Sequence, residues 1–103
     1  MATKPVVVLI AYHAQPGKGP AARTALAGII ADVLKQEPDC LGIRMLENAD
    51  DDTRFLLHET WTSQAAYVGP HMQTPHLKAF IAAAGALFAG PPDISFWQEL
   101  PSA

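Results

Sequence analysis

The sequence predicts a single α+β domain whose elements follow the order β-α-β-β-α-β. At 103 residues the chain has room for one domain, so residues 1–103 are expected to fold as one unit. Apolar runs typical of strands are interspersed with segments whose apolar residues recur every three to four positions, as in helices. Clusters of Gly, Pro, Asn and Asp separate these segments, which is typical of turns.

A strand followed by a long helix is predicted for the first third of the chain. Residues 6–13 are apolar and rich in β-branched side chains, as expected of a strand. The Gly- and Pro-rich residues 14–20 end this strand, and Pro20 suits the first turn of a helix. The helix should end near Glu37, because Pro38 cannot continue it. Its apolar stripe consists of Ala22, Ala25, Leu26, Ile29, Ile30 and Val33.

The middle of the chain is predicted to form a hairpin. Apolar residues alternate with other residues over positions 41–45, which is the period of a strand. The polar tract 48–53 favours a turn, and residues 54–61 alternate again as the returning strand. One face of that strand carries Phe55, Leu57, Glu59 and Trp61.

A split helix and a final strand complete the pattern. Ser63 can cap a short helix over residues 64–68, which Gly69 and Pro70 break, and Thr74 with Pro75 restarts it. The helical period is expected to continue through Phe88 until the Gly-Pro-Pro at 90–92, and residues 94–100 form the last strand. The apolar positions of this second helix are Leu77, Phe80, Ile81, Ala84, Leu87 and Phe88.

This order predicts a ferredoxin-like fold, in which helices cover one face of a four-stranded antiparallel sheet. The other face also carries apolar residues, among them Leu56 and Trp97. In the last strand, Trp97 and Ile94 point to opposite faces. A sheet that is apolar on both sides needs two covering layers. We therefore expect a homodimer in which a second copy supplies the missing layer.

Composition argues against several classes of partner. The net charge is −3 with no basic run, whereas binding nucleic acid requires clustered Arg and Lys. No stretch approaches the roughly 20 apolar residues of a membrane span, and the N-terminal apolar run is interpreted as a strand rather than a signal peptide. Cys40 is the single cysteine, which suits a core position and a reducing cytoplasm.

Residues 59–80 hold the most informative motifs, in the order Glu-x-Trp, His, Thr-Pro-His and an aromatic residue. In this pattern the chain resembles the antibiotic biosynthesis monooxygenase family, most of all its quinol monooxygenase branch. The resemblance implies a dimeric α+β barrel with a pocket between sheet and helices. It also implies oxygenation of a phenol or quinol by O₂ without metal, flavin or haem. The residues that carry it are Glu59, Trp61, His71, Thr74, Pro75, His76 and Phe80, with Pro16-Gly17 and the Glu37…Cys40 pair in support.

Three residues are candidate catalytic groups. Glu59 shares a strand face with apolar side chains, so burial should raise its carboxyl pKa toward neutrality and make it a usable base. His71 follows the Pro70 break, where a loop could direct it into a cleft, and His76 lies in the first turn of a helix, which favours a neutral imidazole. The alternative is that these three side chains brace the fold, with the histidines paired to Glu59.

A metal or haem site is not expected. His58 and Glu59 point to opposite faces of a strand, and His71 and His76 are five residues apart across a helix break. Haem-degrading relatives use a helical His and a first-strand Asn, but the former position falls near Phe80 and the first strand has no Asn. O₂ would therefore be a co-substrate, with no cofactor.

The remaining candidates are pocket walls, predicted to contact a small aromatic substrate. Each of them is also a good core residue. Three hypotheses for the function remain open: the monooxygenase, an isomerase or cyclase acting on a small carbonyl compound, and a non-catalytic dimer that binds a small ligand. The predicted substrate-binding residues are Trp61, Tyr67, Met72, Phe80 and Tyr12.

Overall fold

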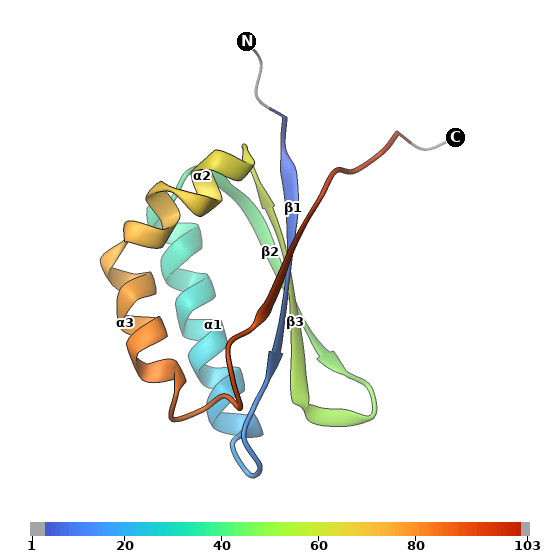
Figure 1. Cartoon of the computed structure of the whole chain (residues 1–103), viewed down its shortest axis with the longest axis vertical. Helices are drawn as coiled ribbons and strands as arrows, with labels where there is room; N and C mark the ends of the chain where they lie inside the picture. Colours follow the sequence, from blue (N-terminus) through green and yellow to red (C-terminus); the bar gives the residue numbers. More distant parts are fainter. Residues whose placement is uncertain (1–3, 102–103) are drawn as a thin grey trace.

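Four strands form one antiparallel sheet, and the helices lie together on one of its faces (Figure 1). This computed structural model describes residues 4–101. The strand order is β2-β3-β1-β4, so the predicted ferredoxin-like α+β fold is confirmed. The elements are β1 (Val6–His13), α1 (Gly19–Gln36), β2 (Cys40–Asn48), β3 (Asp51–Trp61), α2 (Gln64–Val68), the 3₁₀ helix η1 (Pro70–Gln73), α3 (Pro75–Ala84) and β4 (Asp93–Trp97).

The pairing register sets which side chains face the helices. Val8 of β1 lies opposite Glu59 on β3 and opposite Phe96 on β4. Because side chains alternate along a strand, this places the predicted face of β3 on the helix side of the sheet. The core between the sheet and the helices consists of Val6, Val8, Ile10, Ala14, Ala22, Leu26, Ile29, Val33, Cys40, Phe55, Leu57, Trp61, Tyr67, Leu77 and Phe88.

Two glycines explain the sharp turn between β1 and α1. Gly17 has a φ of 77°, a backbone conformation that residues with a side chain rarely adopt. At Gly19, the first residue of α1, a Cβ atom would lie 2.8 Å from the backbone oxygen of Asp52. The start of β3 therefore packs directly against the start of α1, which holds the helix across the sheet.

The predicted split of the second helical region is observed, with one addition. Ser63 caps α2 by accepting a hydrogen bond from the Ala66 amide, and the helix ends before Gly69. A turn of 3₁₀ helix, η1, which the sequence did not predict, fills the gap before α3. The Thr74 hydroxyl accepts from the Leu77 amide and donates to the His71 carbonyl at 2.9 Å. The cap of α3 is thereby joined to the backbone of His71.

The expectation that α3 continues through Phe88 is wrong, because the helix ends at Ala84. Beyond it the backbone pairs with the end of β1 instead: the Gln15 amide donates to the Leu87 carbonyl, and the Ala89 amide donates to the His13 carbonyl. The Gln15 side chain also donates to the Gly85 carbonyl at 2.8 Å. The apolar side chains of this segment still enter the core, which explains why the helical period continued past the helix.

The strand boundaries also differ from those predicted. β2 ends at Asn48 and β3 begins at Asp51. The turn between them is therefore shorter than the polar tract 48–53 that was predicted to form it. β4 ends at Trp97 rather than at residue 100, because Trp97 lies opposite Val7 and β1, its one partner strand within residues 4–101, begins one residue further on, at Val6. An edge strand cannot continue where its neighbour supplies no more hydrogen bonds.

The sheet face opposite the helices is uncovered within residues 4–101 (Figure 1). Leu46, Leu56 and Trp97 lie on this outer face, and Trp97 is 56% exposed. Arg44 and His58 lie opposite each other on the same face. Among the described helices, none is long and apolar enough to cross a membrane.

Candidate active site

Glu59 is a buried carboxylate on the helix side of β3. Its side chain is 4% exposed, and the indole Nε1 of Trp61 donates to its Oε1 at 2.8 Å. Burial raises the pKa of Glu59 to about 7, the nearby Glu37 adds to this effect, and the hydrogen bond from Trp61 opposes it. Glu59 is therefore partly protonated and partly ionised at neutral pH, which is the property required of a general acid or base.

His71 lies in η1 and reaches the end of α1. Its Nδ1 is 2.9 and 3.0 Å from the two carboxylate oxygens of Glu37, which follows the last residue of α1. The residue is 4% exposed, and burial lowers the pKa of its imidazole despite the neighbouring carboxylate. The η1 turn and the Thr74 hydrogen bond position this side chain between helix layer and sheet.

His76 joins the same carboxylate from another element. It is the second residue of α3, as predicted, and its Nε2 lies 2.6 Å from Oε2 of Glu37. The two histidines therefore share Glu37, and the interpretation that they pair with Glu59 is wrong. His76 is not among the residues that line the cavity next to Glu59, so it is connected to that cavity only through Glu37 and His71.

Aromatic rings enclose His71. The Trp61 ring lies with its centre 4.5 Å from the imidazole, and the Tyr67 ring lies 4.9 Å from it. Trp61 and Tyr67 also meet edge to face at 5.5 Å. Trp61 is 1% exposed and does not line the cavity. It contacts Glu59 and His71 from within the core. Burial raises the pKa of the Tyr67 hydroxyl, which keeps it protonated.

Glu59 and His71 border a small inner cavity of about 30 Å³. This volume holds one or two water molecules, whereas an engineered cavity that binds benzene measures about 150 Å³. The carboxylate Oε2 of Glu59 and the Nε2 of His71 form no hydrogen bond within residues 4–101, yet no fully buried side-chain atom there lacks a partner. Both atoms therefore face the cavity. Its other walls are Ile10, Tyr12, Ile29, Ile30, Val33, Ile43, Leu57, Tyr67, Leu77 and Phe80.

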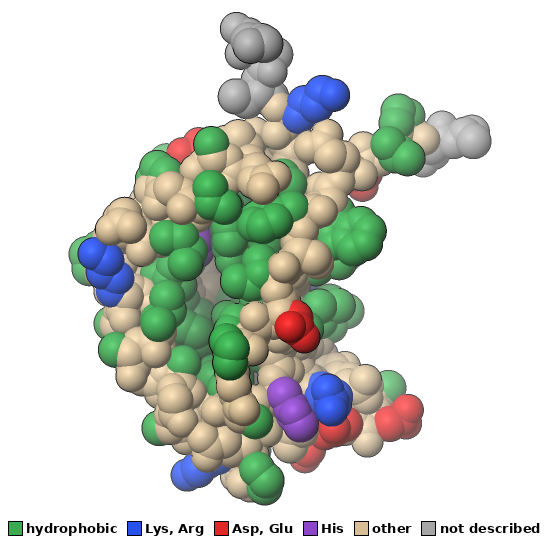
Figure 2. Space-filling view, viewed as in Figure 1, with side chains coloured by type: hydrophobic (Ala, Val, Ile, Leu, Met, Phe, Trp, Pro, Cys, Tyr) green, Lys and Arg blue, Asp and Glu red, His purple; other side chains and the backbone are tan. Residues whose placement is uncertain are grey.

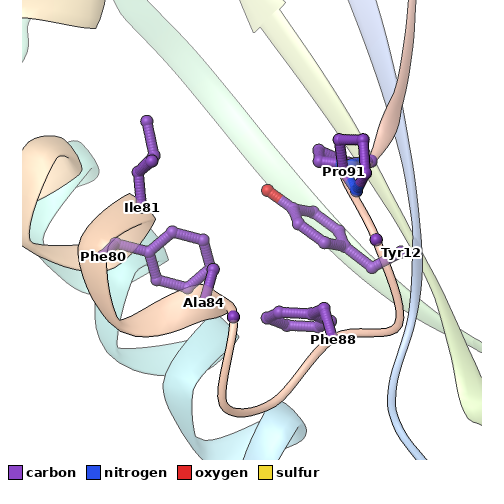
Figure 3. A pocket seen from close by; sticks show the side chains of 9 residues that line it. Tyr12, Phe80, Ile81, Ala84, Phe88 and Pro91 are labelled. Atoms are coloured by element: carbon purple, nitrogen blue, oxygen red, sulfur yellow. The ribbon is translucent and has the colours of Figure 1, made fainter.

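A larger outer pocket of about 360 Å³ opens beside the inner cavity. It appears as an apolar hollow between the helices and the C-terminal part of the chain (Figure 2). Tyr12 and Phe80 line both spaces and meet edge to face at 6.2 Å, with Phe88 packed against Tyr12 at 4.9 Å (Figure 3). Tyr12 and Phe80 therefore separate the outer pocket, which has the volume of a small-ligand site, from Glu59.

The remaining sequence candidates are placed elsewhere. Met72 packs against the core and lines neither space. His58 lies on the outer face of the sheet, away from Glu59, as predicted. Within the described part of the chain, no group of three or more His, Cys, Asp or Glu side chains is arranged to hold a metal ion. Cys40 is buried, and burial raises its thiol pKa to about 11, so the thiol remains protonated and unreactive.

The sequence did not identify Glu37 as a site residue, although the motif Glu37…Cys40 belonged to the family resemblance. Glu37 is 34 and 39 residues from its two histidine partners, so no local spacing connects them. The signal that could have found it is its place just before Pro38, where a helix ends and its last side chains meet the layer beside it.

Comparisons with known proteins identify a family and solved structures of the same fold. The family model described as antibiotic biosynthesis monooxygenase matches residues 5–83. The structure of Rv0793 from Mycobacterium tuberculosis is 26% identical, with 97% of this chain and 99% of that chain covered and a TM-score of 0.82. PA3566 from Pseudomonas aeruginosa is 24% identical over 98% and 99% of the two chains, with a TM-score of 0.86.

A third solved structure carries the family's name. It is described as a "putative antibiotic biosynthesis monooxygenase" from Caulobacter crescentus CB15 and is 24% identical, with 96% of this chain and 92% of that chain covered and a TM-score of 0.85. No curated protein matches the chain. Because the family model covers well over half of the sequence, from β1 to α3, the chain belongs to the antibiotic biosynthesis monooxygenase family.

Proposed function

We propose that the protein is a cofactor-independent monooxygenase that oxidises a small aromatic phenol or quinol with O₂. The observation that carries this proposal is the pair of polar groups at the inner cavity. Glu59, with a pKa of about 7, and the neutral imidazole of His71 both face a space whose other walls are aliphatic and aromatic side chains, two of them tyrosines. A base in apolar surroundings is what generation of a reactive phenolate requires.

The reaction needs no external reductant. Loss of the hydroxyl proton makes the ring electron-rich enough to give an electron to O₂, and a bond then forms between oxygen and a ring carbon. Cleavage of the O–O bond leaves one oxygen on the ring as a carbonyl and releases the other as water. A phenol and O₂ thus give a quinone and water, and all four electrons taken up by O₂ come from the substrate.

The site residues would divide this work. Glu59 takes the hydroxyl proton, and the free Nε2 of His71 interacts with the ring oxygen. His76 acts on that oxygen only through Glu37, while Trp61 and Tyr67 form the wall behind the imidazole. The ring itself does not fit the inner cavity, so the substrate would sit in the outer pocket and displace Tyr12 or Phe80 to bring its hydroxyl to Glu59.

An isomerase or cyclase acting on a small carbonyl compound is the second candidate, since the same base could remove a proton next to a carbonyl. Dependence on oxygen distinguishes the two. We expect the metal-free protein to consume O₂ with hydroquinones and polyphenols, saturably and above the rate of autoxidation, and to give a product one oxygen richer by mass spectrometry. Turnover that continues unchanged without O₂ would favour the isomerase instead.

We also propose that the protein is a homodimer formed through the outer face of the sheet. Leu56 lies near the middle of this face on β3, which is a central strand, and is 36% exposed. Apolar side chains from three strands remain uncovered there, and a second copy presents the same apolar surface.

Leu56→Asp tests this interface because it introduces a charge into the face. We expect the wild-type protein to sediment as a dimer and the variant as a monomer in analytical ultracentrifugation. Leu34→Asp is the matched control, since Leu34 is also exposed but lies on α1 in the helix layer. A monomeric wild type, or dissociation by both substitutions alike, would rule out this face as the interface.

A further inference from the structure

Glu37 is a carboxylate that holds two histidines at the end of α1. Its side chain is 10% exposed, Nδ1 of His71 lies 2.9 Å from its Oε1, and Nε2 of His76 lies 2.6 Å from its Oε2. The histidines come from η1 and α3, so only the packing of the helices brings the three side chains together. An ionised carboxylate accepts hydrogen bonds and has none to donate, so both of these nitrogens carry hydrogens.

These bonds decide which nitrogen of His71 can accept a proton. Burial lowers the pKa of its imidazole, so the ring is neutral at neutral pH and has one N–H. That hydrogen is on Nδ1, where Glu37 accepts it, and the lone pair is therefore on Nε2, which faces the inner cavity. His71 is thus presented to the cavity as a proton acceptor.

We infer that Glu37 is a positioning residue that makes His71 the second base of the proposed reaction, beside Glu59. This role rests on the proposed function, because oxidation of a phenol to a quinone removes two hydrogens from the substrate. One comes from the hydroxyl and one from the ring carbon that gains oxygen. Two acceptors face the cavity, Oε2 of Glu59 and Nε2 of His71, so each hydrogen has an acceptor.

The neighbouring polar groups do not act as bases. Tyr12 and Tyr67 also line the cavity, but burial raises the pKa of both hydroxyls, which keeps them protonated. Nε2 of His76 already carries the hydrogen that it donates to Glu37, so it cannot accept another from that side. His76 therefore only holds the carboxylate in place, and no proton passes through Glu37.

The two protons leave the substrate in sequence. Glu59 takes the hydroxyl proton, the ring carbon bonds to O₂, and Glu59 returns the proton to the outer oxygen, which gives a hydroperoxide. His71 then takes the hydrogen of the same ring carbon at Nε2, the electrons of the C–H bond form the carbonyl, and the O–O bond breaks. The departing hydroxide takes the proton from His71 and leaves as water. Both bases end as they began, and Glu37 stabilises the transient imidazolium.

The size of the cavity sets where the ring is oxidised. At about 30 Å³ it does not hold an aromatic ring, so only neighbouring atoms of the substrate reach Glu59 and His71 together. These are the hydroxyl and the C–H group on the carbon beside it. We therefore expect an ortho-quinone, with the new oxygen next to the hydroxyl oxygen and not across the ring from it.

The tautomer of His71 can be measured without any substrate. In ¹H–¹⁵N spectra of the resting wild-type protein at pH 8, we expect its imidazole hydrogen on Nδ1. Glu37→Leu removes the acceptor, so the hydrogen should move to Nε2, where the carboxylate of Glu59 can accept it. His76→Gln keeps a donor to Glu37 and should leave the His71 hydrogen on Nδ1. A wild-type protein with this hydrogen on Nε2 would overturn the inference, even if neither variant folds.

Kinetics tests the second base, with a phenol that the wild-type protein turns over, deuterated at both carbons beside its hydroxyl. We expect Glu37→Leu to lower kcat about 100-fold, within the range for a lost general base. A primary deuterium isotope effect on kcat should appear in this variant, because removal of the ring hydrogen becomes rate-limiting. Lys78→Gln, an exposed change on α3, is the control and should match the wild type. Glu37→Leu at the wild-type rate, or a para-quinone product, would contradict the inference.

The two proposals fail in different ways. If the wild-type protein takes up no O₂, the proposed function is wrong and the second base with it, whatever the tautomer of His71. If the wild-type protein takes up O₂ but Glu37→Leu shows no isotope effect, the monooxygenase stands and His71 is not its second base.

Discussion

Glu59→Gln is expected to abolish most of the turnover and, at the same time, to stabilise the folded protein above pH 7. Removing a general base typically costs a factor of 10² to 10⁴ in rate. The gain in stability follows from the raised pKa of Glu59, about 7 against an ordinary value of 4.5. Between these pH values the native state holds a proton that the unfolded state has lost, so stability falls as the pH rises.

The size of this effect follows from the same two values. A shift of one pKa unit corresponds to 1.36 kcal/mol, so the raised pKa costs the wild type up to about 3 kcal/mol once the pH exceeds 7. An amide has no charge to lose, and its oxygen can still accept the hydrogen bond from Trp61. The variant therefore does not lose this free energy of unfolding above pH 7. Such a gain is expected where an active-site residue lowers the stability of the fold.

Urea unfolding at pH 5 and at pH 8 measures the difference. We expect Glu59→Gln and wild type to be close at pH 5, and the variant to be more stable at pH 8. His71 titrates in both proteins and does not enter the comparison. Glu99→Gln, an exposed carboxylate, should leave stability unchanged at both pH values. Equal stability of wild type and Glu59→Gln at pH 8 would show that Glu59 is not held in a costly ionised state.

Trp61→Phe is the second change with a large expected effect, because the indole is both a core residue and a hydrogen-bond donor. The substitution keeps an aromatic ring but leaves Oε1 of Glu59 without its partner at 2.8 Å. A buried group that loses its partner typically costs about 1–3 kcal/mol. The same loss raises the pKa of Glu59 further, since the hydrogen bond from Trp61 favours the ionised form.

Two measurements should therefore change together in Trp61→Phe. The free energy of unfolding falls by about 1–3 kcal/mol, and the pH at which activity is half-maximal moves upward. Trp97→Phe is the matched control for the pH dependence: its indole also donates to a side chain two residues away, Ser95, but lies on the outer face of the sheet, so this substitution can weaken the proposed dimer but should leave the pH of half-maximal activity unchanged. If both substitutions move the pH of half-maximal activity equally, the hydrogen bond to Glu59 has no special role.

The pairing of Glu59 with Trp61 also allows a double-mutant test. If the two side chains act on stability only through their hydrogen bond and the shared core, Glu59→Gln should reduce the cost of Trp61→Phe at pH 8, where the carboxylate is charged. At pH 5, where Glu59 is protonated in the native state, the coupling should be smaller. Simple additivity at both pH values would argue against an interaction between the indole and the ionised carboxylate.

Much of the fold could be predicted because its signals are local. The alternating pattern of residues 55–61 placed Glu59 and Trp61 on the buried side of β3, and the register confirms this. Caps and breaks marked by Ser63, Gly69 and Thr74 predicted where α2 ends and α3 begins. These features depend on backbone geometry within one or two turns, which neighbouring residues decide.

Boundaries that depend on distant partners were not predictable in this way. Leu87 and Phe88 continue the apolar period of α3, but their backbone bonds to residues 13–15 at the end of β1. The same holds for β4, which ends where β1 provides no further partner. A hydrophobic period indicates which side chains are buried, but it does not indicate which residues the backbone of the same segment hydrogen-bonds to.

The sequence by itself determined the order of the elements, the buried face of β3, the break before His71 and the family to which the motifs point. Only the tertiary structure decided how the polar residues are connected. Glu37 meets His71 and His76 across 34 and 39 residues, while Glu59 bonds to Trp61 and not to either histidine. Local patterns fix secondary structure and burial, whereas a hydrogen bond between distant residues depends on the packing of whole elements, which brings the ends of α1, η1 and α3 together at one carboxylate.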